Sequence, residues 1–127
     1  MKKPVPTEHE EQKVVIQWFD VQHKRLKGRL FAVPNGGARH KAVAGKLKAE
    51  GVRPGVPDLW LPVPAGGFSG LVIEMKRLKG SSTSDEQLDW LDFLARQGFL
   101  AVICKGADAA IDTIQAYLAE GEGNERN

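Results

Sequence analysis

The sequence PGVPDLWLPVPAGGFSGLVIEMK, residues 54–76, decides the fold. Two short apolar runs, DLWL and LVIEMK, are joined by a segment rich in Pro and Gly, which predicts two strands and a hairpin turn. Because side chains alternate along a strand, Glu74 and Lys76 lie on one face of the second strand. Asp58 stands at the start of the first strand, directly after a proline, where a missing N–H costs little. The stretch therefore predicts charged side chains on a strand whose other residues are apolar.

Asp58, Glu74 and Lys76 are residue types that can hold a divalent metal against a phosphodiester. Mg²⁺ prefers oxygen ligands and commonly binds one or two carboxylates, while water and phosphate oxygens fill the other positions. The metal polarises the phosphoryl oxygen and lowers the pKa of a water, and a nearby lysine can orient that water. The Met75 carbonyl is a further candidate ligand. Taken alone, Glu-x-Lys is often a solvated ion pair and Val-Pro-Asp a turn, so the hypothesis depends on their order and shared sheet.

The chain has 127 residues, 42% of them apolar, which is enough for one domain with a single core. We expect that domain over residues 1–120 and a disordered tail over 121–127. No apolar run approaches the length of a membrane span. Cys104 is the only cysteine and lies in the apolar run FLAVIC, which predicts a core residue and excludes an internal disulfide. These features favour a reducing, cytoplasmic setting and argue against a zinc site.

The net charge of +2 hides an uneven distribution. Residues 1–53 hold twelve Lys and Arg against five Asp and Glu, whereas residues 54–127 hold six against eleven. Clustered basic residues are typical of proteins that bind the phosphate backbone of nucleic acid, although on helices they are more often a solvated face. The acidic motif that follows them favours nucleic acid. The candidate DNA-binding residues are Asn35, Arg39, Lys41, Lys46, Lys48 and Arg53.

Helix and strand signals alternate along the rest of the chain. Thr7 and Glu10 form a capping-box pattern, which predicts a helix running to about Leu26. Ser84 and Gln87 repeat this pattern before a helix that ends near Gly98. The other expected elements are strands over 30–33, 58–61, 71–76 and 99–104, a basic helix over 38–50 and a last helix that follows Gly106 and runs through Leu118. This order predicts an α/β fold, with a central mixed sheet of about four strands flanked by helices.

Two further polar side chains fall on helix faces that are expected to point inward. Glu8 and Glu11 share a stripe of the first helix with Val15. Acidic residues in a first turn usually complement the helix dipole, and Glu8, Glu10 and Glu11 all remain candidates for a site residue. Helical phase favours Glu11, which lies deeper in the helix. Gln87 precedes two leucines by one and two turns, so it is expected to point into the sheet.

Together, Glu11, Asp58, Glu74-Met75-Lys76 and Gln87 resemble the PD-(D/E)xK nuclease pattern. The flanking motifs EHEEQ, FAVPNGGAR, LKAEGVRPGVPDLWLPVP, GLVIEMK and SxxQ resemble the VRR-NUC family (virus-type replication-repair nucleases), in particular its small stand-alone phage and prophage members. The resemblance covers roughly residues 8–110, and several motifs recur in the same order.

The resemblance implies a restriction-endonuclease-like fold and cleavage of DNA phosphodiester bonds that depends on Mg²⁺ or Mn²⁺. It also implies a homodimer that acts on branched DNA such as four-way (Holliday) junctions, in phage or prophage DNA replication, recombination or repair. Asp58, Glu74 and the Met75 carbonyl would hold a metal, and Lys76 would orient or activate water. Gln87 would position Lys76 or the scissile phosphate. Glu11 would bind a second metal or a metal-bound water.

The main alternative is a DNA-binding module with a nuclease-like fold that does not cut. The basic stretch suits this module equally well, but a pure binder gains nothing from three carboxylates beside phosphates, because like charges repel. A third interpretation is a metabolic α/β protein that binds a small phosphate at Asn35-Gly36-Gly37. It is the weakest of the three, since no phosphate-binding loop followed by Lys and Ser or Thr is present.

Overall fold

A computed structural model gives the structure of the chain. It describes residues 4–34 and 41–125, with the backbone alone for 41–44 and 121–125. The elements follow the alternation of helix and strand that the sequence predicts. They are α1 (Glu8–Gln22), a 3-10 helix η1 (Lys24–Leu26), β1 (Phe31–Ala32), α2 (Lys41–Ala49), β2 (Leu59–Leu61), β3 (Leu71–Lys76), α3 (Asp85–Arg96), β4 (Leu100–Lys105) and α4 (Ala107–Glu125).

The four strands form one mixed sheet in the order β1-β2-β3-β4. β1 and β3 both run antiparallel to β2, whereas β3 and β4 are parallel. A parallel pair needs a long crossover between its strands, and α3 supplies it. β3 is a central strand and is buried along its whole length. The predicted α/β fold with a mixed sheet of four strands is thereby confirmed.

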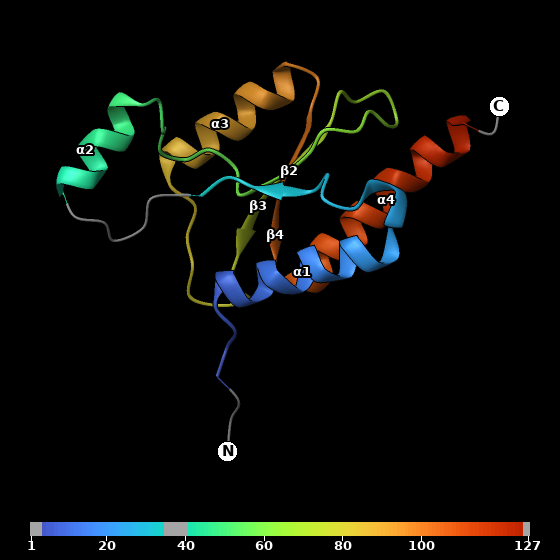
Figure 1. Ribbon diagram of the computed structural model, residues 1–127, viewed down its shortest axis with the longest axis horizontal. Helices are drawn as coiled ribbons and strands as arrows, with labels where there is room; N and C mark the ends of the chain where they lie inside the picture. Colours follow the sequence, from blue (N-terminus) through green and yellow to red (C-terminus); the bar gives the residue numbers. More distant parts are fainter. Residues whose placement is uncertain (1–3, 35–40, 126–127) are drawn as a thin grey trace.

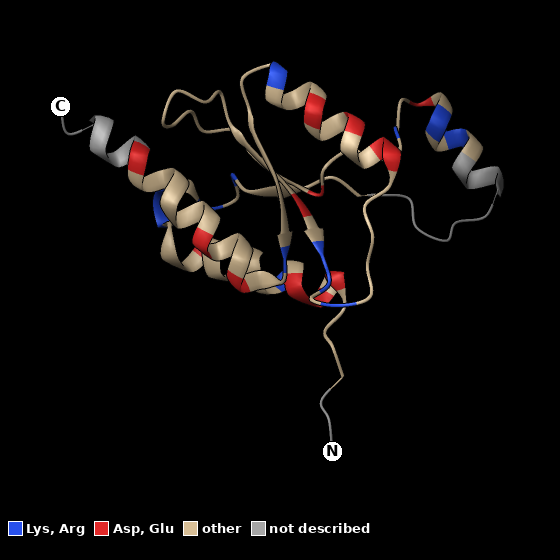
Figure 2. Ribbon diagram, turned by 180° about the vertical axis from the view of Figure 1, so that it is seen from behind, with Lys and Arg blue, Asp and Glu red and all other residues tan. Residues whose placement is uncertain are grey.

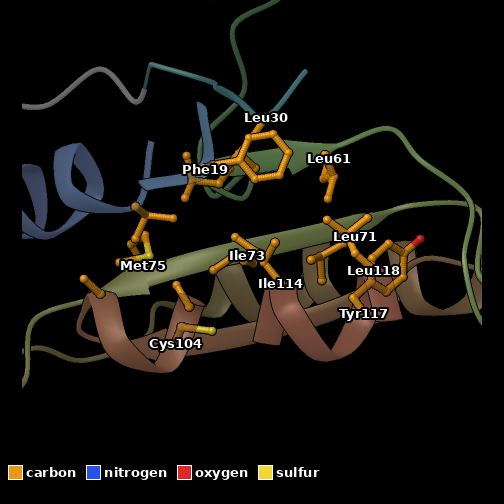
Figure 3. Packing of buried hydrophobic residues seen from close by; sticks show 14 of the residues in the cluster. Phe19, Leu30, Leu61, Leu71, Ile73, Met75, Cys104, Ile114, Tyr117 and Leu118 are labelled. Carbon is orange, nitrogen blue, oxygen red and sulfur yellow. The ribbon is translucent and has the colours of Figure 1, made fainter. Parts of the chain in front are cut away.

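Helices cover both faces of this sheet (Figure 1). α1 and α4 lie side by side on one face, and α3 lies on the other. Alternation along β3 sends Ile73 and Met75 toward α1 and α4. Figure 3 shows these two side chains in one apolar cluster with Phe19 of α1 and Ile114 of α4. The opposite face of β3, which carries Glu74, is therefore the face toward α3.

Cys104 belongs to the same apolar cluster, which confirms its predicted place in the core. Burial raises the pKa of the Cys104 thiol, and the thiol sulfur lies 3.6 Å from the Thr113 hydroxyl. A thiol with a raised pKa is a poor nucleophile near neutral pH, because the thiolate is the reactive form.

Two capping boxes begin the helices on either side of the sheet. Thr7 caps α1, and its backbone N–H donates to Glu10 Oε1 at 3.1 Å while its hydroxyl accepts from the Glu10 N–H. Ser84 caps α3 in the same reciprocal way with Gln87. Both helix starts are where the sequence predicts them.

The first helix is shorter than predicted, because α1 ends at Gln22 rather than near Leu26. His23 leaves the helical conformation, with φ −115° and ψ 68°. The chain then tightens into η1, and the Gly28 N–H donates to Asp20 Oδ1 at 3.0 Å. Gly28 has a φ of 81°, a left-handed value that glycine adopts without strain. A local turn around Asp20 thus replaces the last helical turn.

Other boundaries differ by smaller amounts. β1 contains two residues, and β4 is shifted by one residue relative to the predicted strand over 99–104. The start of the predicted helix over 38–50 lies outside the described residues. α4 continues to Glu125, so helical backbone enters the segment 121–127 that the sequence predicts as a tail. Within the described ranges, no helix is both long and apolar enough to cross a membrane.

Candidate active site

Asp58 and Glu74 lie opposite one another at the point where β2 and β3 stop pairing. The register pairs Leu59 with Ile73, so the next opposed positions are Asp58 and Glu74, on the same face of the sheet. Asp58 Oδ2 accepts a hydrogen bond of 2.8 Å from the Met75 backbone N–H. That contact takes the place of a strand-to-strand bond, because β2 begins at Leu59. The hairpin backbone therefore holds the two carboxylates together.

The same geometry makes the Met75 carbonyl a candidate ligand. In an antiparallel pair, the N–H and C=O of one residue point to the same side, so the Met75 carbonyl faces the side of Asp58. The residue that the register places opposite Met75 is Pro57, which has no N–H to donate. Because the strand pairing stops at Pro57, the Met75 carbonyl oxygen is left on the side of the two carboxylates.

Glu74 is a buried carboxylic acid, with 1% of its surface exposed. Its Oε2 accepts from Gln87 Nε2 at 2.8 Å and lies 3.6 Å from Lys76 Nζ. Its Oε1 is buried and has no hydrogen-bond partner among the described residues. Burial, and next the negative charge of Asp58, raise the pKa of Glu74 to about 8. The pair is therefore short of positive charge, and a cation would stabilise its ionised form.

Lys76 is held by Gln87 as well as by Glu74. The Lys76 ammonium donates to Gln87 Oε1 at 2.8 Å, and Lys76 as a whole is 5% exposed. Gln87 Oε1 also accepts the Ser84 backbone N–H at 2.9 Å. One amide therefore joins the cap of α3 to both charged residues of β3. Gln87 points into the sheet, as the helical spacing predicts.

The three N-terminal glutamates have different surroundings. Glu10 is used in the capping box, and the backbone hydrogen bond from Thr7 lowers its pKa. Glu11 is half-buried, and its Oε2 would lie 2.9 Å from a Cβ added at Gly106. The Gly106 N–H in turn donates to the carbonyl of Lys76 at 2.9 Å. Glu11 thus sits at the carboxyl ends of β3 and β4.

Glu8 is also close enough for its charge to raise the pKa of Glu74. Figure 2 shows the acidic first turn of α1 beside the basic ends of the two parallel strands. In the described part of the chain, no three Asp, Glu, His or Cys side chains come close enough to hold a metal ion. The structure therefore brings Asp58, Glu74, Lys76 and Gln87 into direct contact, with the N-terminal glutamates nearby.

The donor set of this site fits a hard divalent cation. Two carboxylates and a backbone carbonyl are oxygen donors, which suit Mg²⁺ or Mn²⁺ rather than softer metals. The unpartnered Glu74 Oε1 is an oxygen of the kind that such an ion would bind. Gly106 keeps the neighbouring space open, since a side chain there would meet Glu11 and Leu78.

The candidate DNA-binding residues are described only in part. Lys46, Lys48 and Arg53 are exposed, on α2 and on the loop that follows it. Asn35 and Arg39 lie outside the described residues, as does the side chain of Lys41. Figure 2 shows basic segments on α2, which lies near the acidic first turn of α3.

The structure adds Lys105, which the sequence does not single out, and gives Ser84 a role in the site. Lys105 is exposed and stands beside Lys76 in the parallel register of β3 and β4. Ser84 orients Gln87 through the capping box. The SxxQ spacing predicts the cap, but no sequence signal fixes the register between two parallel strands.

Known proteins share this architecture. A family model described as the VRR-NUC domain matches residues 3–108. A solved structure described as "VRR_NUC domain protein" is 32% identical in sequence and has a TM-score of 0.80, over 94% of this chain and 93% of that chain. No curated protein matches the chain. Because the family model covers most of the sequence, including every candidate catalytic residue, this chain belongs to the VRR-NUC domain family.

Proposed function

We propose that this protein is a metal-dependent DNA endonuclease that hydrolyses phosphodiester bonds. The observation that carries the proposal is the surroundings of Glu74. One oxygen of this buried carboxylate is held by Gln87 and Lys76, and the other receives no hydrogen bond from a donor among the described residues. Burial, and next the nearby charge of Asp58 and a side-chain hydrogen bond with it, raise the pKa of Glu74 to about 8, which supports the proposal. Perturbed acids of this kind are concentrated at functional sites.

Asp58, Glu74 and the Met75 carbonyl would hold Mg²⁺ or Mn²⁺. When bound, such an ion polarises the phosphoryl oxygen and makes hydroxide available near neutral pH. The role of the protein is to supply oxygen ligands from the hairpin of β2 and β3. The bond from the Met75 N–H fixes Asp58, and the bond from Gln87 fixes Glu74. Little rearrangement of these side chains would be needed when an ion binds.

Lys76 would orient the attacking water and offset negative charge that grows on the phosphate. Its ammonium is held by Gln87 Oε1 at 2.8 Å, and Glu74 lies 3.6 Å away. An amine fixed in a buried setting stabilises developing charge more strongly than one in bulk water. Gln87 would act by positioning Lys76 and Glu74 rather than by touching the reacting atoms.

Glu11 would bind a second ion or a water next to the first site. Its place at the carboxyl ends of β3 and β4, against Gly106, supports this role. Glu8, whose charge reaches Glu74, is the competing candidate. Single substitutions of Glu8 and Glu11 would distinguish the two candidates.

We further propose that the substrate is branched DNA, such as a four-way junction, and that the protein acts as a homodimer. Membership of a nuclease family supports DNA as the substrate class. The excess of Lys and Arg over residues 1–53 supports contact with the phosphate backbone. A two-fold enzyme can cut two strands in a symmetric way, which is the physical attraction of a dimer. A role in replication, recombination or repair follows from a junction substrate.

A plasmid nicking assay tests the catalytic proposal. We expect nicking with Mg²⁺ or Mn²⁺ and none in EDTA. Asp58→Asn and Lys76→Ala should abolish nicking while folding and DNA binding survive. Asp89→Asn and Lys79→Ala, which change exposed residues of the same types, serve as matched controls. Full activity in either site variant would contradict the assignment, and DNA binding without any metal-dependent cut would instead identify a binding module.

The substrate proposal needs its own assay. Duplex, flap, splayed and four-way DNA of equal length should be cleaved at different rates, with the four-way junction fastest. Sedimentation of the protein alone should give twice the monomer mass. Equal cleavage of all four substrates would contradict structure selectivity, and a monomer that cuts both strands of a junction would contradict the proposed dimer.

A further inference from the structure

A cavity of about 500 Å³ lies next to the carboxylate site and has no role in the proposed hydrolysis. Its walls come from the end of β1, from α2, from the loop before β2 and from α3. They are mostly apolar, with Val33, Leu47, Val52 and Val56 among them. Trp90 is the aromatic residue of the lining, and Arg53 is the charged one among the residues that the structure describes. A concave, mostly apolar site of this size with few polar groups is typical of a pocket for an organic ligand.

Residues of the cavity lining are close in the chain, or hydrogen-bonded, to residues of the carboxylate site. Trp90 follows Gln87 by three residues on α3, which places their side chains about 5–6 Å apart at Cβ. The Val33 N–H donates to the Asp58 carbonyl at 2.8 Å. Val56 precedes Asp58 by two residues along the chain. The cavity is therefore lined by parts of the same two segments that carry Asp58 and Gln87.

Close packing fixes the loop that forms one wall. Gly55 has a φ of 85°, and a Cβ added there would lie 2.6 Å from the backbone carbon of Glu86. The loop therefore touches the first turn of α3 backbone to backbone, which is possible because residue 55 is a glycine.

The charge around the cavity indicates the kind of occupant. Lys46 and Lys48 flank Leu47 on α2 and are exposed, and Arg53 adds a guanidinium. An uncharged apolar ligand gains nothing from this basic surround. A nucleobase fits both features, because its flat ring stacks on an aromatic side chain while its phosphates meet the lysines and the arginine.

We infer that this cavity receives an unpaired base of the DNA, stacked on the indole of Trp90, while Arg53 contacts the adjoining backbone. The inference rests on the proposed function and deepens it, since it gives the site a means to prefer DNA with unpaired bases. A base in an intact duplex must first unpair and leave its stack, and this step costs free energy. A base that is already unpaired avoids that cost. Branched DNA supplies unpaired or easily unpaired bases at its junction.

Binding measured by fluorescence anisotropy in EDTA tests this inference without any cleavage. Stacking of one base on one aromatic side chain increases the binding affinity about tenfold. Trp90→Ala should therefore weaken binding to a duplex with a single-stranded tail about tenfold, and binding to a fully paired duplex less than twofold. Trp90→Phe, which keeps an aromatic ring, should recover most of the loss. Leu88→Ala removes an exposed apolar side chain from the same helix outside the cavity and should bind both DNAs like the unchanged protein.

An abasic scan locates the base. One unpaired base at a time is replaced by an abasic nucleotide, and we expect one position at which the unchanged protein loses about tenfold while Trp90→Ala loses nothing more. Such a coupled position would establish the contact. Equal weakening of both DNAs by Trp90→Ala, or no coupled position in the scan, would overturn the inference. Melting temperatures of the variants show whether each is folded.

The two proposals fail in distinguishable ways. If nicking is absent and the coupling between Trp90 and one base is present, the cavity binds a base and the catalytic proposal falls. If nicking is present and Trp90→Ala binds every DNA like the unchanged protein, the inference about the cavity falls alone.

Discussion

Gln87 Oε1 lies 2.8 Å from Lys76 Nζ, and this contact joins the start of a helix to the charged face of the central strand. The same amide donates from Nε2 to Glu74 at 2.8 Å, and its oxygen also accepts the Ser84 N–H. Because the ammonium and the backbone N–H are both donors, the amide oxygen must face them and the NH₂ group must face the carboxylate. The orientation of Gln87 is therefore set by its partners.

Gln87→Ala removes the contacts to Lys76 and Glu74 together. Hydrogen bonds to charged groups contribute about 1.5–3 kcal/mol each, so we expect the nicking rate at saturating Mg²⁺ to fall at least tenfold. The control is Ser84→Ala, which removes the helix cap and leaves both of those contacts possible. It should lower the free energy of unfolding by about 1 kcal/mol and slow nicking less than threefold. Equal losses of nicking in the two variants would show that Gln87 matters for the helix alone.

The pKa of Glu74 predicts how stability changes with pH. Its ordinary value is 4.5 and its value in the folded metal-free protein is about 8, so between these values the folded state holds a proton that the unfolded state has lost. The free energy of unfolding should therefore fall as pH rises from about 4.5 to about 8. Urea unfolding at pH 5.5 and pH 8.5 measures this, and Glu74→Gln should lose much less stability between the two. An equal loss in both proteins would contradict the raised pKa.

Gly106→Ala should displace the side chain of Glu11. Gly106 has a φ of 85°, and an added Cβ would lie 2.7 Å from Leu78 Cδ2 and 2.9 Å from Glu11 Oε2. Gly67 also has a φ of 85° and has nothing within 4 Å of an added Cβ, so Gly67→Ala isolates the effect of backbone strain. We expect Gly67→Ala to cost about 1 kcal/mol of stability. Gly106→Ala should cost more and should slow nicking as well. Equal melting temperatures and nicking rates for the two variants would contradict this packing.

The three N-terminal glutamates can be separated by single substitutions. Glu11→Gln should slow nicking at least tenfold with little change in melting temperature, because Glu11 lies at the strand ends and makes no part of the cap. Glu10→Gln should lower the melting temperature slightly and leave nicking unchanged, since Glu10 serves the capping box. Glu8→Gln should lower the pKa of Glu74, whose value the charge of Glu8 raises. A tenfold loss of nicking in Glu8→Gln alone would transfer the role to Glu8.

Much of this fold follows from short-range sequence signals. The alternation in LVIEMK predicts which side chains of β3 share a face, and all six residues prove buried between two helical layers. Both capping boxes start helices where Thr7 and Ser84 predict them, because those hydrogen bonds form within one turn. Asp58 and Glu74 come together because a hairpin brings its own strand ends into register.

Features that depend on long-range contacts could not be predicted from local sequence patterns. The parallel pairing that sets Lys105 beside Lys76 depends on how α3 crosses the sheet. The end of α1 is decided by a bond between Asp20 and Gly28, eight residues apart, which competes with one more helical turn. The cavity beside Trp90 needs four segments to meet, and no local pattern predicts that meeting.

Calorimetric titration of the apo protein with Mn²⁺ at pH 8.5 tests most directly whether Asp58 and Glu74 hold a divalent ion. The unchanged protein and the control Asp89→Asn should bind Mn²⁺ with the same affinity. Asp58→Asn and Glu74→Gln should each weaken that affinity at least tenfold while their melting temperatures show folded protein. Unchanged Mn²⁺ affinity in both site variants would contradict the account, since the ion would then be bound elsewhere.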